Sequence, residues 1–214
     1  FDGEIGGGPD DKNKQIVSHD NGPRQQQTLA ALEKLNPYFD RRNGTVTVGN
    51  ACQITDGAVS MVLMSEEKAK AEGVDVLGYI HSFAYAGLEP ERMGLGPVYA
   101  MSKLFRASGY GVEDIDLFEI NEAFAVQVLA CVNAMDSTEF AKSHLNQSKK
   151  CGEIDMNKCN VNGGSIALGH PVGATGARII LTLCHELKKQ KKQRGCASLC
   201  IGGGQGGAVI VESE

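Results

Sequence analysis

Residues 160 to 178 concentrate the residue types that could do chemistry, because His170 and Pro171 lie there among five glycines. The apolar residues that follow recur at helical spacing, so a helix is expected to begin at Pro171, where the missing N–H costs nothing. The N-terminus of a helix carries partial positive charge, which disfavours a charged imidazole. We therefore expect a neutral His170 that gives or accepts one hydrogen bond. A histidine that merely satisfies a turn is the alternative interpretation.

Two further stretches place polar groups where strands are expected to end. Asn121 follows the strand expected over 115–120, and open α/β sheets bind ligands at the carboxyl ends of strands. An asparagine that caps the following helix is the ordinary alternative. Cys200 precedes residues 202–207, which formally fit the G-x-G-x-x-G pattern of dinucleotide sites. Because a strand over 208–211 follows instead of a helix, we interpret this run as a hairpin that exposes backbone N–H groups.

Three segments, in this order, resemble the signature motifs of thiolases, the acyl-CoA C-acyltransferases. They are Asn121-Glu122-Ala123-Phe124-Ala125, the run NGGSIALGHPVGATG at 162–176, and Cys200-Ile201-Gly202-Gly203-Gly204-Gln205-Gly206. The resemblance covers nearly all of this chain but only about the second half of a thiolase. It implies an enzyme that cleaves or forms β-ketoacyl-CoA with coenzyme A or acetyl-CoA, by thiolysis or Claisen condensation. The nucleophilic cysteine of the family lies in the first half.

The resemblance implies catalytic roles for four residues of this chain. His170 would activate the nucleophilic cysteine and stabilise the thioester oxyanion. Asn121 would hold a water that, with His170, binds the enolate oxygen. Cys200 would be the second catalytic cysteine, which moves the proton of the acetyl α-carbon or of the attacking thiol. The Gly202 N–H would complete an oxyanion hole for the acyl-enzyme, a donor typically worth about 3–4 kcal/mol.

Three more positions resemble substrate-binding positions of the family. Arg24 would lie near the adenosine end of coenzyme A, where a guanidinium can pair with phosphate or stack on adenine; a solvated arginine is the alternative. Cys52 stands beside the pantetheine arm, where many thiolases have serine, and a packed small residue is the competing interpretation. Met93 would line the acyl end of the pocket, although methionine more often fills a core.

The apolar patterns predict an α/β fold, a mixed five-stranded sheet covered by helices, which resembles the C-terminal half of the thiolase fold. We expect residues 1–65 to be the tail of the N-terminal half, a loop region plus its last strand, and residues 66–214 to be the thiolase C-terminal domain. Within the first segment, residues 1–22 are expected to be a surface loop. Strands are expected over 45–48, 58–64, 76–85, 115–120, 196–201 and 208–211 and just before the pair Gly163–Gly164, and helices over 28–35, from Glu66 to Gly73, from Pro97 to Phe105, over 122–132, near 139–144 and from Pro171 to Gln193.

The composition is that of a globular protein and argues against a nucleic-acid partner. Hydrophobic residues make up 42% of the 214 residues, and the formal net charge is −5. The cysteines number seven, an odd count at irregular spacing without a Cys-x-x-Cys pair. This indicates a reducing intracellular location, the cytoplasm or a mitochondrial or peroxisomal matrix. No apolar run approaches the length of a membrane span, and no histidine–cysteine spacing fits a zinc site.

The resemblance also implies partners. Coenzyme A and acyl-CoA would be substrates with no further cofactor, and the N-terminal thiolase half, in the same or a separate chain, would complete the enzyme. A homo-oligomer, either dimer or tetramer, is expected. The polar segment 135–158 resembles the degradative thiolases of fatty acid β-oxidation, including those of multienzyme complexes.

Two other classes of protein stay open at this point. The chain could be a non-catalytic assembly half of a thiolase-like complex. It could also be a condensing enzyme of the related ketoacyl synthase group, which typically uses two histidines, or one histidine and one asparagine, where this chain offers His170 with Cys200.

Replacing Cys200 by serine, in an enzyme completed by the first thiolase half, is expected to lower turnover by about 10²–10⁴-fold, because a serine hydroxyl is too weak an acid and base near neutral pH. Acylation of the nucleophile should suffer less, since His170 and the Gly202 N–H remain. Claisen condensation measured beside single-turnover acyl-enzyme formation separates the two steps. Condensation within a few-fold of the parent enzyme would show that Cys200 only packs.

Overall fold

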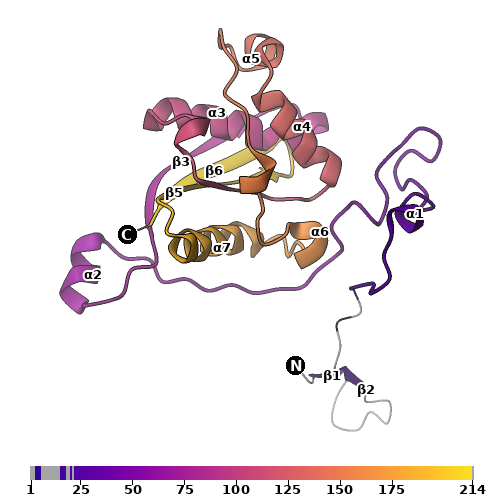
Figure 1. Ribbon diagram of the computed structural model, residues 1–214, viewed down its shortest axis with the longest axis horizontal. Coiled ribbons are helices and arrows are strands. Elements are labelled where there is room, and N and C mark those ends of the chain that lie inside the picture. The colour runs from indigo at the N-terminus through magenta and orange to yellow at the C-terminus, as the bar shows by residue number, and fades with distance from the viewer. Residues whose placement is uncertain (1–2, 6–14, 18–19, 21, 214) are drawn as a thin grey trace. The chain divides into compact units, whose positions relative to one another are not determined.

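The computed structural model describes residues 3–5, 15–17, 20 and 22–213 (Figure 1). The chain divides into two compact units, residues 1–35 and residues 36–214. The second unit contains the sheet and every candidate site residue except Arg24.

The described residues of the first unit form one strand pair and one short helix. Strands β1 (Gly3–Ile5) and β2 (Gln15–Val17) pair antiparallel. Helix α1 (Leu29–Leu32) begins after Thr28, whose hydroxyl accepts the Ala31 N–H. The helix predicted over 28–35 is therefore confirmed but shorter. The loop predicted over 1–22 lies largely outside the described residues, and where they are described, residues 3–5 and 15–17 form paired strands instead of a loop.

A mixed sheet of four strands forms the centre of the second unit, in the order β3-β6-β5-β4. Strand β6 pairs antiparallel with β3 and β5, whereas β5 and β4 run parallel. The α/β class is confirmed. Among the described residues, however, the sheet has four strands where five are predicted. The strands are β3 (Tyr79–Gly87), β4 (Leu117–Ile120), β5 (Arg194–Ile201) and β6 (Gln205–Glu212).

The strand predicted before the glycine pair is replaced by a single bridge between Phe118 and Cys159. Asn160 takes a positive φ of 50° and turns the chain away from the sheet. Its side-chain amide then acts as a substitute for strand backbone, since Oδ1 accepts the Ile120 N–H and Nδ2 donates to the Ile120 carbonyl, each at 2.9 Å. The Asn160 side chain and its backbone N–H, which donates to the Phe118 carbonyl at 2.9 Å, thus satisfy the edge of β4 in place of a fifth strand.

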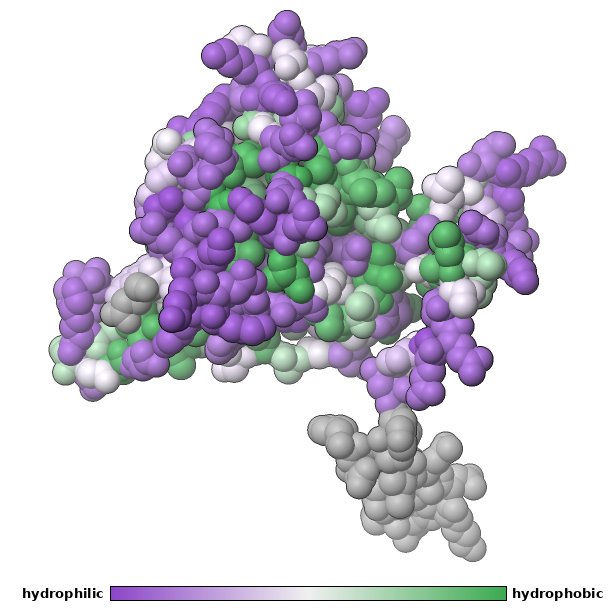
Figure 2. All heavy atoms as spheres, in the orientation of Figure 1, coloured by the Kyte–Doolittle hydropathy of each residue, from purple (hydrophilic) through white to green (hydrophobic). Residues whose placement is uncertain are grey.

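The strands predicted over 45–48 and 58–64 are wrong, because neither segment finds a partner strand among the described residues. The second of these segments belongs to an extended stretch, residues 53–64, here called the strap. Its apolar side chains are largely uncovered, and Val62 is 81% exposed. Figure 2 shows hydrophobic residues at the surface along the strap. An exposed apolar segment of this kind marks a surface that another element would cover.

Helices cover both faces of the sheet, with α3 and α4 above it and α7 below it in Figure 1. Apolar side chains of α3 and α4 pack with those of one sheet face around Phe118, Met101 and Ile210. Leu183 and Leu187 of α7 pack on the opposite face against Leu117 and Val211. The bounds are α3 (Gly96–Ser108), α4 (Ala125–Met135) and α7 (Thr175–Gln190).

The shorter helices follow the local signals of the sequence. Ser65 caps α2 (Glu66–Glu72), and Gly73 ends it in the left-handed conformation. Gly109 ends α3 in the same way, as predicted. Helix α5 (Thr138–His144) confirms the helical turn expected near 139–144. The remaining elements are α6 (Ser165–Leu168) and the 3₁₀ helices η1 (Pro90–Leu95), η2 (Val112–Asp114) and η3 (Met156–Lys158).

Within the described part of the chain, no helix combines the length and apolar character needed to cross a membrane.

One charged residue lies inside the sheet layer. Glu119 on β4 is only 5% exposed. Burial raises the pKa of its carboxyl to about 7, while the positive charge of Arg178 opposes the shift and Glu186 adds to it. The folded protein therefore holds the Glu119 proton more tightly than the unfolded chain does.

Replacing Glu119 by glutamine is expected to remove a pH dependence of stability. With a folded pKa of about 7 against 4.5 unfolded, the stabilisation is full below pH 4.5 and is lost as the pH rises through 7. The loss amounts to about 3 kcal/mol. Urea unfolding at pH 5 and pH 8 should show Glu119→Gln gaining far more on the parent at pH 8 than at pH 5. The exposed Glu139→Gln serves as the control, and equal pH dependence in Glu119→Gln and the parent would contradict the buried-acid account.

Candidate active site

Asn121 lies at the carboxyl end of β4 and points into the site. Its backbone N–H donates to the Ser198 carbonyl at 2.9 Å, which ties it to the neighbouring strand β5. The helix that follows begins at Ala125 with Phe124 as its N-cap, so Asn121 does not cap it. Instead the Asn121 Nδ2 lies 3.3 Å from the Nε2 of His170. The structure therefore brings together two of the predicted catalytic residues, which are 49 positions apart in the chain.

The loop that carries His170 has a backbone only glycine adopts easily. Gly169 has φ 86° and ψ 165°, a region that costs other residues about 1–3 kcal/mol. The side chain of Thr55 lies where a Gly169 Cβ would be, and the Thr55 hydroxyl accepts the His170 N–H at 3.2 Å. The strap and the loop are thus held together at the position of the histidine.

The helix after His170 begins at Thr175, later than the predicted start at Pro171. A turn intervenes, in which the Pro171 carbonyl accepts the N–H groups of Ala174 and Thr175 at 2.8 and 2.9 Å. Glycine is a poor helix former, and Gly173 lies in this turn. The helix terminus is therefore farther from the imidazole than the sequence suggests.

The pKa of His170 is lowered, first by burial and second by the positive charge of Arg178. This is the direction that the sequence predicts, and the causes that the structure adds are burial and a nearby cation. The other ring nitrogen, Nδ1, lies 2.7 Å from the Thr175 hydroxyl. A half-buried, neutral imidazole with both nitrogens hydrogen-bonded is suited to moving one proton.

Sequence reasoning did not identify Ser165 and Arg178 as part of the site. The Arg178 guanidinium donates to the Gly169 carbonyl at 3.0 Å and to the Ser165 hydroxyl at 2.9 Å. The Ser165 hydroxyl donates to the Oδ1 of Asn121 at 2.5 Å. Ser165 lies in the segment that resembles the thiolase histidine motif, and Arg178 follows that segment. This position is the signal that could have suggested both residues.

Glu122 holds the start of the segment that carries Ser165. Its carboxylate accepts the Ile166 N–H at 3.4 Å, and burial raises the pKa of this carboxyl. Gly164 approaches Glu122 so closely that a Cβ at this position would overlap the carboxylate. The second residue of the Asn-Glu-Ala-Phe motif thus holds the start of α6, which positions Ser165.

Cys200 and Gly202 lie on the hairpin that joins β5 and β6. Residues 202–204 form the turn, with Gly203 and Gly204 at φ 85° and 87°. The hairpin prediction is confirmed, and the strand after it rules out the dinucleotide-loop interpretation of 202–207. Gly202 is exposed, whereas Cys200 is buried, and burial raises the pKa of its thiol.

Cys52 reaches the same end of the sheet. Its N–H donates to the Ala123 carbonyl at 2.9 Å, next to a bridge between Ala51 and Phe124. Burial raises the pKa of the Cys52 thiol, and a charge on Cys52 would raise that of Cys200 further. Cys52 therefore fits the interpretation of a packed residue near the site and not that of a nucleophile.

Met93 and Arg24 are the remaining predicted binding residues. Met93 is half-buried in η1, where the adjacent Gly94 carbonyl accepts a hydrogen bond from the Cys131 thiol at 3.3 Å. Arg24 is exposed and belongs to the first unit. The acyl contact of Met93 and the adenosine contact of Arg24 stay predictions.

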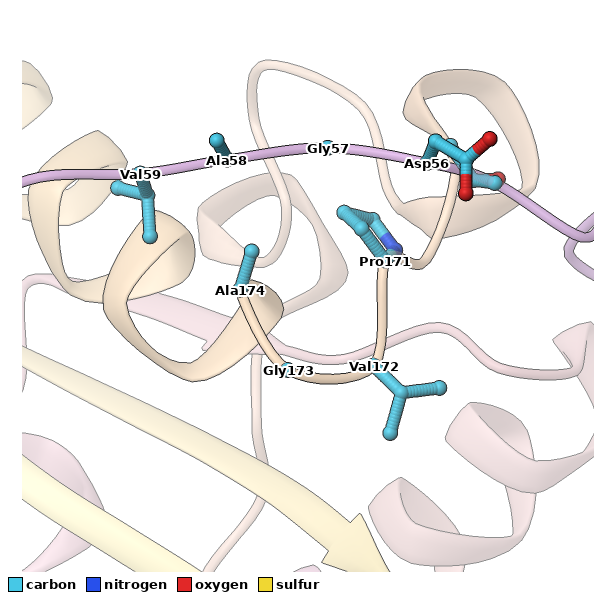
Figure 3. A pocket seen from close by; sticks show the side chains of 9 residues that line it. Asp56, Gly57, Ala58, Val59, Pro171, Val172, Gly173 and Ala174 are labelled. Atoms are coloured by element: carbon cyan, nitrogen blue, oxygen red, sulfur yellow. The ribbon is translucent and has the colours of Figure 1, made fainter.

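An open groove of about 400 Å³ lies where the strap crosses the loop that begins at Pro171, the residue after His170. In Figure 3 the Pro171 ring lies beneath the strap at Gly57, where a Cβ would fall 2.7 Å from the ring. The lining is backbone and small side chains, with Asp56 as its one acidic residue. The groove offers room beside the histidine but none of the catalytic groups.

All seven cysteines lie in the described part of the chain, and each is free. Burial raises the pKa of every one of these thiols, to about 12 at Cys131 and Cys159. A cysteine nucleophile needs its pKa lowered by a cation, a helix terminus or a base. Among the described residues, no three of the ligand types His, Cys, Asp and Glu form a possible metal site.

Comparison with known proteins identifies the family of the chain. Residues 74–213 match the thiolase C-terminal domain, and residues 1–67 match the thiolase N-terminal domain. The chain therefore belongs to the thiolase family. The predicted boundary at 65/66 stays a prediction.

The curated relatives are named 3-ketoacyl-CoA thiolase. That of Shewanella amazonensis is 45% identical over 201 residues, which are 94% of this chain and 46% of the relative. That of Serratia proteamaculans is 46% identical over 199 residues, which are 92% of this chain and 46% of the relative. The chain thus spans about half the length of these relatives.

Solved structures show the same fold. The acetyl-CoA acetyltransferase of Bacillus anthracis superposes with a TM-score of 0.82 at 40% identity, over 100% of this chain and 49% of that one. The human mitochondrial 3-ketoacyl-CoA thiolase in complex with CoA gives a TM-score of 0.76 at 38% identity, over 94% of this chain and 47% of that one.

Replacing Gly169 by alanine is expected to lower the free energy of unfolding by about 1–3 kcal/mol, because its φ of 86° disfavours a Cβ. Gly173→Ala is the matched control, since a Cβ there meets nothing within 4 Å. Urea unfolding followed by circular dichroism measures both variants. Equal stability of the two would show that the loop carrying His170 tolerates other backbone angles.

Proposed function

We propose that this chain provides the His170, Asn121, Cys200 and Gly202 part of an acetyl-CoA C-acyltransferase that cleaves or forms β-ketoacyl-CoA with coenzyme A. The observation that carries the proposal is the contact between Asn121 Nδ2 and His170 Nε2, at the sheet edge from which the Cys200 hairpin projects. The names of the relatives, 3-ketoacyl-CoA thiolase, support the same reaction.

The nucleophilic cysteine is supplied by the other half of the enzyme. None of the seven thiols in this chain has a lowered pKa. The exposed apolar strap and the groove beside His170 offer a surface for that half. The activity of the whole enzyme is thus shared between the two halves.

In thiolysis, the His170 Nε2 accepts the proton of the incoming nucleophilic thiol, and the thiolate attacks the β-carbonyl carbon. The carbon–carbon bond breaks, and its electron pair passes to the acetyl-CoA enolate. The enolate oxygen accepts hydrogen bonds from the now protonated Nε2 and from a water held by Asn121. Such donors act where charge develops and are worth several kcal/mol each, about 3–4 for a well-placed one.

Cys200 completes the proton transfers. Its thiol gives a proton to the enolate carbon, which releases acetyl-CoA. The Cys200 thiolate then takes the proton of coenzyme A, which attacks the acyl-enzyme while the Gly202 N–H binds the oxyanion. The thiol of the nucleophile leaves with the proton that His170 held. Burial raises the pKa of Cys200, so it is protonated near neutral pH, as the first of these steps requires.

Binding and assembly follow the family pattern in the proposal. Arg24 contacts the adenosine end of coenzyme A, Cys52 the pantetheine arm and Met93 the acyl end. The enzyme is a homo-oligomer, and the polar segment 135–158, which contains α5, fits a member of a β-oxidation complex. Seven free thiols suit a reducing intracellular compartment.

The proposal predicts that the chain alone shows no turnover of acetoacetyl-CoA with coenzyme A, measured as loss of enolate absorbance. Turnover is expected once the first half of the Shewanella amazonensis relative is fused before residue 1. His170→Ala in that fusion should lower turnover by about 10²–10⁴-fold. Ser143→Ala, an exposed hydroxyl on α5, is the control and should keep the parent rate.

Turnover by the chain alone would contradict the proposal that the other half supplies the nucleophilic cysteine. A folded fusion that binds coenzyme A without turnover would favour the non-catalytic assembly half.

A further inference from the structure

We propose that Arg178 and Ser165 are positioning residues that fix the amide of Asn121 and, with Thr175, hold His170 as the neutral Nδ1–H tautomer. The inference deepens the proposed function and rests on it for the use that the reaction makes of His170. The hydrogen bonds that carry it run without a break from the guanidinium to the imidazole.

Arg178 sets the direction of the first link because a guanidinium only donates hydrogen bonds and stays charged at any working pH. Its Nη2 donates to the Ser165 Oγ at 2.9 Å, while Nη1 is anchored on the Gly169 carbonyl. Ser165 therefore accepts from this side. Its single hydroxyl proton is left for the other neighbour, the Asn121 side chain.

Ser165 in turn fixes which way the Asn121 amide faces. The hydroxyl proton needs an acceptor, and Asn121 Oδ1 lies 2.5 Å away. A flipped amide would place N–H groups against Ser165 and leave its proton without an acceptor. Ser165 is 1% exposed and Asn121 2% exposed, so water does not readily take over this role. The amide N–H groups consequently face His170.

The orientation of Asn121 decides the tautomer of His170. An amide N–H at 3.3 Å from Nε2 requires a lone pair on that nitrogen. The ring proton then lies on Nδ1, where Thr175 Oγ1 accepts it at 2.7 Å. Thr175 is free to accept because its own proton goes to the Pro171 carbonyl at 3.0 Å. Each donor in the chain meets an acceptor, and every link has one polarity.

This polarity is what the proposed reaction needs. The Nε2 lone pair can take the proton of the nucleophilic thiol once the Asn121 N–H turns from it to the water that the proposed function assigns to Asn121. The same nitrogen then carries the N–H that binds the enolate oxygen. A guanidinium keeps its charge in the working pH range, so the links from Arg178 through Ser165 to the Asn121 Oδ1 persist while His170 changes charge, and only the contact between Asn121 Nδ2 and Nε2 gives way.

The ring nitrogens of His170 report the tautomer directly, without any need for turnover. Long-range ¹H–¹⁵N correlation spectra of the ¹⁵N-labelled chain distinguish the protonated ring nitrogen from the unprotonated one, and His170→Gln identifies the signals. The variants are Ser165→Ala, Arg178→Gln and Arg178→Lys, with Ser143→Ala as the control. Amide spectra of each variant show whether it is folded, and Ser165→Ala decides the matter if Arg178→Gln is not.

The expected result is an Nδ1–H tautomer in the parent chain and in Ser143→Ala. In Ser165→Ala and Arg178→Gln the tautomer ratio should shift at least several-fold towards Nε2–H, because the Asn121 amide is free to turn over. Arg178→Lys, which keeps a charge that only donates, should hold the ratio closer to the parent than Arg178→Gln does. An Nε2–H parent, or a folded Ser165→Ala with the parent ratio, would overturn the proposal.

Kinetics of the fusion enzyme test the consequence for catalysis. Ser165→Ala is expected to lower kcat by about 10²-fold, the cost of a catalytic group displaced by about 1 Å, and to leave KM within a few-fold. Parent kcat in a Ser165→Ala enzyme with a shifted tautomer would also overturn the positioning role. Absence of turnover in the parent fusion would count against the proposed function, while the tautomer measurement would still test this inference.

Discussion

The parallel pairing of β4 with β5 is the interaction on which the site depends. It aligns Ile120 with Ser198, so Asn121 and the Cys200 hairpin leave the sheet at the same edge. A slip of one residue would turn every side chain of β4 to the opposite face and bury Asn121 among apolar residues. The pairing is held on both faces by cores that enclose β4 completely. Core packing and site geometry are therefore one constraint.

The polar groups behind the site are costly to bury and are retained in a connected form. Buried donors and acceptors are tolerated when each finds a partner, and a partly satisfied network is worse than an apolar core. Asn121, Ser165 and Thr175 are all buried and all paired. At Glu119 the cost of burial appears as a raised pKa, because burial favours the protonated carboxyl. Burying these polar groups costs stability, but it fixes the positions of the hydrogen-bond donors behind the site.

The same molecule has a second, opposite feature, an apolar segment left uncovered. The strap carries Val62 and Leu63 at the surface and forms no strand among the described residues. The raised thiol pKa values agree with the proposed function, in which the nucleophilic cysteine belongs to the other half. The chain spans about half of its relatives. The uncovered strap and the absence of an activated thiol in this chain both agree with that coverage.

The sequence by itself determined the features that short-range physics controls. Ser65, Gly73 and Gly109 mark helix ends, and the glycine hairpin after Cys200 follows from backbone angles and nearest neighbours. Three motifs also placed His170, Asn121 and Cys200 in the family pattern.

Only the tertiary structure decided what depends on a distant partner. A strand exists only beside another strand, so the apolar pattern of 58–64 was misleading, and the Asn160 amide replaced a predicted strand at β4. The link from Arg178 through Ser165 to Asn121 joins three separate elements. The hydrophobic periodicity of the sequence does not predict such a link, because the direction of each hydrogen bond is set only when the groups meet in space.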